Sequence, residues 1–137
     1  MSRAKSKSTV DWIDQLLGEA SWLLSHAQAL ADYGRKEEAA AELARAAACE
    51  EQVACLLEAD GRDREAALHR VSAASCHEKL GQYARAVTLL HAALSTAAPD
   101  DYRFAAEQQL TRCLAQAQKG LRRPPRRSAR RPSSALP

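Results

Sequence analysis

Aromatic residues and long apolar runs are scarce in this chain. Only 4% of its 137 residues are aromatic, although 46% are hydrophobic, because alanine supplies much of that share. Alanine has the highest helix propensity, and its small side chain lets helices pack closely. No apolar stretch approaches the ~20 residues that a bilayer requires, and the N-terminal MSRAKSKST is polar and basic, unlike a secretory signal. We therefore expect one small, all-helical, cytoplasmic domain that does not span a membrane.

Motifs for catalysis and for metal binding are also missing. The sequence has no GxSxG and no glycine-rich phosphate loop, and its histidines do not follow the Glu-x-x-His spacing of di-metal bundles. The four cysteines form no CxxC pair: Cys49, Cys55, Cys76 and Cys113. We expect no enzyme, no catalytic residue, no cofactor and no metal. The cysteines are interpreted as small buried hydrophobes in a reducing compartment, and the glutamates between residues 37 and 58 as a solvated face.

Three glycines interrupt the chain in the same way. Gly34 opens GRKEEA, Gly61 opens GRDREA and Gly81 opens GQYARA, and each follows an apolar run with helical spacing. Glycine ends a helix readily because it accepts the left-handed backbone conformation of a C-terminal cap. An alanine follows each glycine after five residues and lets the next helix lie close to its predecessor. The recurrence predicts helix, tight turn and helix, repeated.

The apolar periodicity predicts five helices in an antiparallel stack, joined by short loops. The first starts at a cap formed by Thr9 or Asp11 and stops at Gly34. Two others are expected over about 36–59 and 63–80. The fourth is expected from Tyr83 to a stop at Pro99, and the fifth from a cap at Asp100 or Asp101 to a close at Gly120. Leu90 and Leu94 are expected in the core of the clearest hairpin.

Charge is distributed unevenly along the chain. Residues 10–118 hold all 17 acidic residues and ten of the 20 basic ones, a net charge of −7. We interpret them as the folded domain, between a disordered basic lead over residues 1–9 and a disordered Arg/Pro/Ser-rich tail over residues 119–137. Because guanidinium groups pair well with phosphate, the tail arginines are candidate polyanion-binding residues: Arg122, Arg123, Arg126, Arg127, Arg130 and Arg131. A solubilising tail without a specific role is the alternative.

The stretch GQYARAVTLLHAALSTAAPDD resembles the second half of a tetratricopeptide repeat. Gly81, Tyr83, Ala86 and Ala93 match that family's turn and second helix, which gives one good repeat over about residues 67–99. A weaker copy covers about residues 20–50, with Lys36 in place of the turn aromatic. The turns lie 27 and 20 residues apart, whereas the family repeats every 34 or so. The resemblance implies stacked helical hairpins that bind a peptide or another protein. The family's carboxylate clamp of Lys, Asn and Arg is not matched, and no ligand contact is carried over.

Two functions follow as hypotheses. The first is a protein–protein interaction module, an adaptor or chaperone-like protein that holds a peptide or partner helix between its hairpins, with acidic rim residues favouring basic partners. The alternative is a nucleic-acid-associated accessory protein that binds polyanions through the tail without sequence preference. Self-association is compatible with either.

Overall fold

The chain folds into five α-helices in a computed structural model that describes residues 8–95 and 100–122. The helices are α1 (Thr9–Asp32), α2 (Lys36–Ala59), α3 (Asp63–Lys79), α4 (Tyr83–Ser95) and α5 (Asp100–Arg122). No strand occurs among these described residues. The predicted all-α fold class is confirmed. The expected stop at Pro99 lies outside the described residues.

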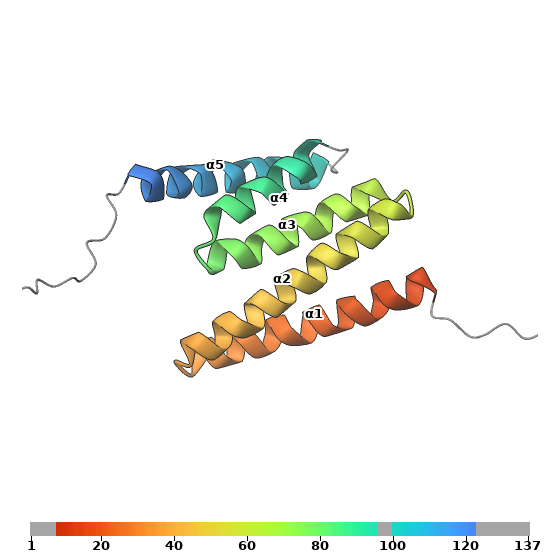
Figure 1. The fold of residues 1–137 in the computed structure, drawn as a ribbon, viewed down its shortest axis with the longest axis horizontal. Coiled ribbons are helices and arrows are strands. Elements are labelled where there is room, and N and C mark those ends of the chain that lie inside the picture. Colours follow the sequence, from red (N-terminus) through yellow and green to blue (C-terminus); the bar gives the residue numbers. More distant parts are fainter. Residues whose placement is uncertain (1–7, 96–99, 123–137) are drawn as a thin grey trace, which may run out of the picture.

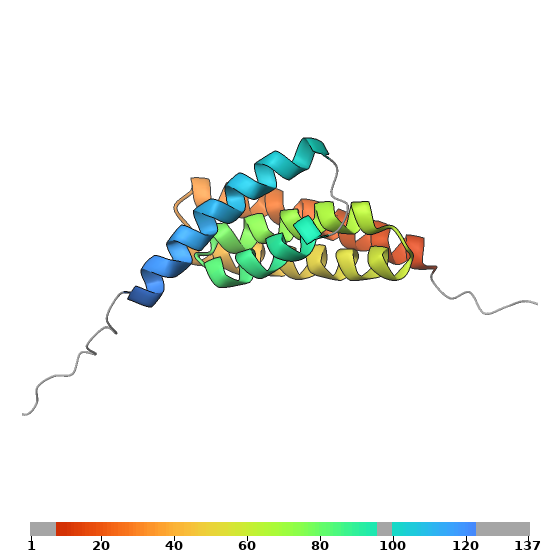
Figure 2. The ribbon, with the colours of Figure 1, turned by 90° about the horizontal axis from the view of Figure 1, so that it is seen from above.

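Consecutive helices run antiparallel and follow one another through the molecule in chain order (Figure 1). Within the described ranges each helix packs on its neighbours in sequence, and the one additional contact joins α3 to α5. Helix α5 lies obliquely across the others (Figure 2). Helix α1 packs on α2 alone, so its outer side forms one end of the stack.

The three predicted glycine turns are confirmed. Gly34, Gly61 and Gly81 have φ angles of 80°, 78° and 76°, in the left-handed region. Each turn closes with the same hydrogen bond, from the residue after the glycine back to a carbonyl five residues earlier: Arg35 to Leu30 (2.9 Å), Arg62 to Leu57 (2.8 Å) and Gln82 to His77 (2.8 Å). This is the Schellman arrangement, which satisfies carbonyl groups at the helix end.

Both outer helix ends differ from the prediction. Ser8, rather than Thr9 or Asp11, caps α1: its hydroxyl accepts from the Asp11 backbone N–H, and the Asp11 carboxylate accepts from the Ser8 backbone N–H. This reciprocal pair is a capping box. At the other end Gly120 does not close α5, which continues to Arg122. Gly120 has no positive φ, so it is an ordinary helical residue.

Small side chains dominate both main core clusters. One joins α1 and α2 to part of α3, with Leu23, Val53 and Leu57 fully buried at its centre. The second joins α3, α4 and α5 around Leu90, which is buried completely among alanines and Cys113. Leu90 is thus a core residue as expected, whereas Leu94 is only partly buried at the edge of this cluster. Alanines at the helix contacts allow the close approach that the composition predicted.

None of the helices formed by the described residues has the length and apolar character of a membrane span.

Candidate functional site

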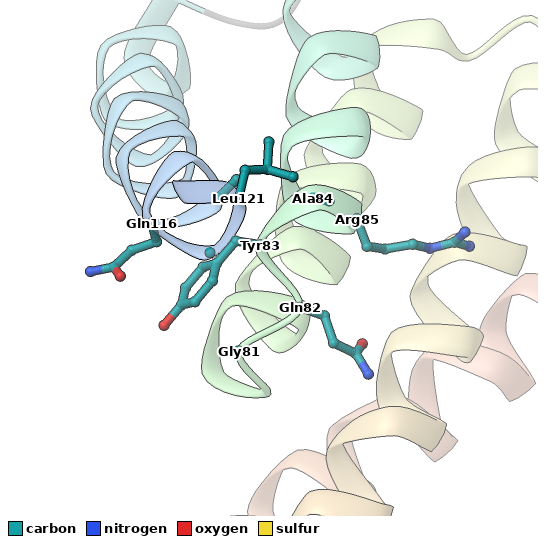
Figure 3. A pocket seen from close by; sticks show the side chains of 9 residues that line it. Gly81, Gln82, Tyr83, Ala84, Arg85, Gln116 and Leu121 are labelled. Carbon is teal, nitrogen blue, oxygen red and sulfur yellow. The ribbon is translucent and has the colours of Figure 1, made fainter. Parts of the chain in front are cut away.

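A groove of about 400 Å³ lies between the start of α4 and the end of α5. Figure 3 shows the Tyr83 ring at this groove, with Gln116 and Leu121 of α5 beside it. The lining residues come from two short segments, Gly81 to Arg85 and Gln116 to Leu121: Gly81, Gln82, Tyr83, Ala84, Arg85, Gln116, Ala117, Gly120 and Leu121. The site therefore lies where the α3–α4 hairpin meets the next helix, between successive hairpins.

Two glycines shape this groove in different ways. Gly81, with its positive φ, ends the preceding helix and lets α4 begin two residues later. Gly120 lies within α5, and a Cβ built there would meet nothing within 4 Å, so its missing side chain leaves space open. A sequence that places glycine inside a helix loses up to ~1 kcal/mol relative to alanine.

The groove is mainly apolar, with polar groups at its edges. Tyr83, Ala117 and Leu121 provide the apolar surface, and Leu121 is 86% exposed. Gln82 and Gln116 offer amide donors and acceptors, whereas Lys119 and Arg122 of the last turn of α5 are not among the residues that line the groove. The acidic rim expected from the sequence does not form here.

Arg85 lines the groove but its guanidinium points away, toward α2 (Figure 3). It donates to the carboxylate of Glu51, which also accepts from His77 Nε2 at 2.8 Å. Burial by itself raises the pKa of Glu51, but the hydrogen bonds from His77 and Arg85 outweigh it, so the pKa lies below its usual value. His77 also hydrogen-bonds Gln82 at 2.7 Å. Arg85, a groove residue, is thereby connected to Glu51 of α2 and through it to His77 of α3.

The histidine–glutamate pairs between helices were not found by sequence reasoning. Glu42 pairs with His26 of α1, and Glu50 pairs with His69 of α3 at 2.8 Å. Glu50 is only 6% exposed, so the expectation of a fully solvated acidic face on α2 was wrong. A burial that would be costly for a lone carboxylate is tolerated because the imidazole supplies a hydrogen bond. The partners lie 16 to 26 residues apart, beyond any local pattern.

The cysteines agree with their interpretation at three positions of four. Cys49, Cys76 and Cys113 are buried, and burial raises the pKa of each thiol, which makes it less reactive. Cys55 is exposed, contrary to expectation. Within the described residues no cluster of three or more histidine, cysteine or acidic side chains is arranged to hold a metal ion.

The candidate polyanion-binding arginines fall mostly outside the described residues. Arg122 is the last residue of α5 and is exposed. The remaining five lie beyond it in sequence: Arg123, Arg126, Arg127, Arg130 and Arg131. The structure therefore places one of the six, at the end of the helix that forms one wall of the groove.

No protein-family model, curated protein or solved structure matches this chain.

Proposed function

We propose that the protein is an interaction module, an adaptor or chaperone-like protein, that binds a peptide or partner helix in the groove between α4 and α5. The observation that carries the proposal is the apolar groove of about 400 Å³ between successive hairpins, lined by Tyr83, Ala117 and Leu121. Ligand sites are characteristically concave and mostly apolar, with a few polar groups that orient the ligand. A tetratricopeptide-like role of the hairpins and a cytoplasmic location belong to the same proposal.

The groove chemistry defines the partner. An apolar side chain fits beside Tyr83 and Leu121, and the amides of Gln82 and Gln116 can hydrogen-bond the peptide backbone. The preferred ligand is thus a peptide that places an apolar residue in the groove and hydrogen-bonds the amides of Gln82 and Gln116 through its backbone.

A pair of matched variants tests this proposal. Gly120→Leu places a side chain in the open space of the groove, and Ala115→Leu places the same side chain at an exposed position of α5 that does not line the groove. Peptides selected on the full-length protein from a random library should share an apolar residue. Their binding should fall at least ~10-fold in Gly120→Leu and stay unchanged in Ala115→Leu. Selected peptides that bind Gly120→Leu as tightly as the parent protein would refute the groove as the binding site.

Polyanion binding through the arginine-rich tail remains the second candidate. The feature that favours it is seven basic residues between Lys119 and Arg131 with no acidic residue after Glu107. If charge alone drives binding, the logarithm of the binding constant should fall against the logarithm of the salt concentration with a slope near −0.9 for each phosphate neutralised on duplex DNA. The binding should also show no preference for DNA sequence. Fluorescence anisotropy with DNA of several sequences tests it in the full chain and in a full-length variant with the six tail arginines changed to glutamine. Equal binding by both proteins would exclude the tail.

A further inference from the structure

Both tryptophans of the chain lie exposed on the same flank of α1. Trp12 and Trp22 are 46% and 58% exposed, which is unusual for side chains of this size in a protein with few aromatic residues. Gln15, Glu19 and His26 complete the flank, because steps of three and four residues keep side chains on one side of a helix. We call these five residues the α1 tryptophan face. Since α1 packs on α2 alone, no other described helix covers it (Figure 1).

Helix α1 is also the most one-sided element in charge. Its 24 residues contain four carboxylates, all exposed, and no lysine or arginine: Asp11, Asp14, Glu19 and Asp32. Two cations of the neighbouring chain segments approach them. Arg45 of α2 lies 3.7 Å from Glu19, and Arg62 is within electrostatic reach of Asp14. Helix α1 therefore carries a net negative charge, and Glu19, which Arg45 of α2 approaches, is the carboxylate that lies on the α1 tryptophan face.

Trp22 is already stacked on one side. The His26 ring lies 4.6 Å from the indole, centroid to centroid, with 24° between the ring planes. Gly18 precedes Trp22 by one helical turn, and a Cβ added at Gly18 would meet nothing within 4 Å. The absent side chain leaves room next to the indole on the helix surface. A planar cation can approach there and also reach the carboxylate of Glu19, three residues before Trp22.

We propose that the α1 tryptophan face binds an arginine-rich peptide. Guanidinium groups stack on indole rings and at the same time pair with carboxylates, and Glu19 lies on this face three residues before Trp22. Trp12 and Trp22 are ten residues apart, about 15 Å along the helix. An extended peptide spans that distance in four to five residues. The partner is thus a peptide with arginines at that spacing, and its site is separate from the groove between α4 and α5, so the inference does not depend on the proposed function.

The chain itself supplies a suitable probe sequence. Arg122-Arg123, Arg126-Arg127 and Arg130-Arg131 repeat every four residues. A labelled synthetic peptide of residues 119–137 is titrated into the full-length protein whose own six tail arginines are changed to glutamine, so that the tail does not compete. Because Trp12 and Trp22 are the only tryptophans, emission excited at 295 nm reports on this face alone. We expect a saturable change in tryptophan emission that follows the anisotropy of the peptide and weakens steeply with salt.

Matched variants locate the binding. Trp12→Ala and Trp22→Ala should each lower the affinity for the peptide about threefold, and the double variant should lower it about tenfold, as measured by anisotropy. Phe104→Ala removes an even more exposed aromatic from α5 and should leave affinity unchanged. Trp22→Phe keeps an aromatic ring and should retain most of the binding if Trp22→Ala proves poorly folded. A peptide with lysine at every arginine should bind more weakly.

Four results would overturn the proposal. They are peptide binding without a change in tryptophan emission, affinity unaltered in the double variant, equal binding of the lysine peptide, and no binding at low salt. Binding without a change in tryptophan emission would show that the basic peptide binds elsewhere on the acidic domain. Binding that Gly120→Leu abolishes would instead assign the peptide to the groove.

Discussion

Glycine has two different roles in this chain, and the backbone dihedral angles separate them. At Gly34, Gly61 and Gly81 the φ angle is positive, and the residue allows one helix to end and the next to begin. Gly18 and Gly120 lie within helices, where glycine brings only extra freedom to the unfolded chain. At all five positions an added Cβ would meet nothing within 4 Å. Substitution effects should therefore follow backbone conformation and not crowding.

We predict opposite signs for the same substitution at two glycines. Gly81→Ala should destabilise the protein by about 1–2 kcal/mol, because alanine pays a steric penalty in the left-handed region. Gly18→Ala should stabilise it by about 0.5–1 kcal/mol, since alanine favours the helix interior. Urea denaturation followed by circular dichroism measures both. A tolerated alanine at Gly81 would mean that α3 and α4 do not turn at this residue.

Leu90 provides the second prediction at the level of one residue. Its side chain is fully buried at the centre of the second core cluster, so Leu90→Ala leaves a void and should cost about 2–5 kcal/mol. Leu121 is 86% exposed, and Leu121→Ala should change stability by less than about 0.5 kcal/mol. Equal effects of the two variants in urea denaturation would contradict the assignment of the second core cluster.

At the scale of the helix, local sequence was sufficient for most boundaries. Helix α2 spans 36–59 as predicted, because a glycine turn sits on either side of it. The start of α1 was misassigned, since Ser8, Thr9 and Asp11 are all good capping residues and only the geometry shows which one caps. The end of α5 was misassigned because glycine is a frequent but not obligatory stop signal.

Contacts between helices were the part that the sequence could not predict. The groove depends on how α5 crosses α4, and nothing in a single helix encodes that crossing. The pairing of Glu50 with His69 and of Glu51 with His77 also joins residues that are distant in sequence. A glutamate on a helix has the same local pattern whether it faces solvent or an imidazole. Only the exposed tryptophans could have been suspected from the sequence, since they flank the predicted apolar face of α1.

The α2–α3 contact leads to a prediction about pH. In the folded state the pKa of Glu51 is below its usual value of 4.5, because hydrogen bonds from His77 and Arg85 outweigh the effect of burial. Its contribution to stability is therefore fully present above about pH 4.5 and is lost as the pH falls through the lower folded pKa. Glu51→Gln should lower stability at pH 6 and flatten the decline between about pH 5 and 3.

Urea midpoints across this pH range give the measurement for Glu51. Glu37→Gln is the control, because Glu37 is exposed at the start of the same helix and should leave the slope unchanged. Part of the dependence of stability on pH should persist in Glu51→Gln, since Arg112 also holds the pKa of Glu78 below its usual range by hydrogen bonding. If the urea midpoints of Glu51→Gln fall with pH in parallel to those of the parent protein, the His77–Glu51–Arg85 contact adds nothing to the stability of the fold.

The whole molecule is a stack in which contacts follow chain order, and this has consequences for how it opens. Helices α2, α3 and α4 each have a neighbour on both sides, whereas α1 has one, and α5 rests on α4 with limited contact to α3. Only three residues of α5 are buried, Ala106, Gln109 and Cys113. Proteins built from local contacts unfold in parts, and the parts with least burial open first.

We predict a gradient of hydrogen-exchange protection along the stack. Amides of α2 and α3 should exchange slowest and those of α5 fastest, with α5 opening while the α1–α2 cluster around Leu23 and Val53 stays folded. Leu90→Ala should lower protection in α4 and α5 and leave α1 and α2 nearly unchanged, because Leu90 belongs to the second cluster alone. Exchange followed by mass spectrometry resolves the helices. If Leu90→Ala lowers protection uniformly, the stack is one cooperative unit, and the groove between α4 and α5 cannot open independently to admit a partner.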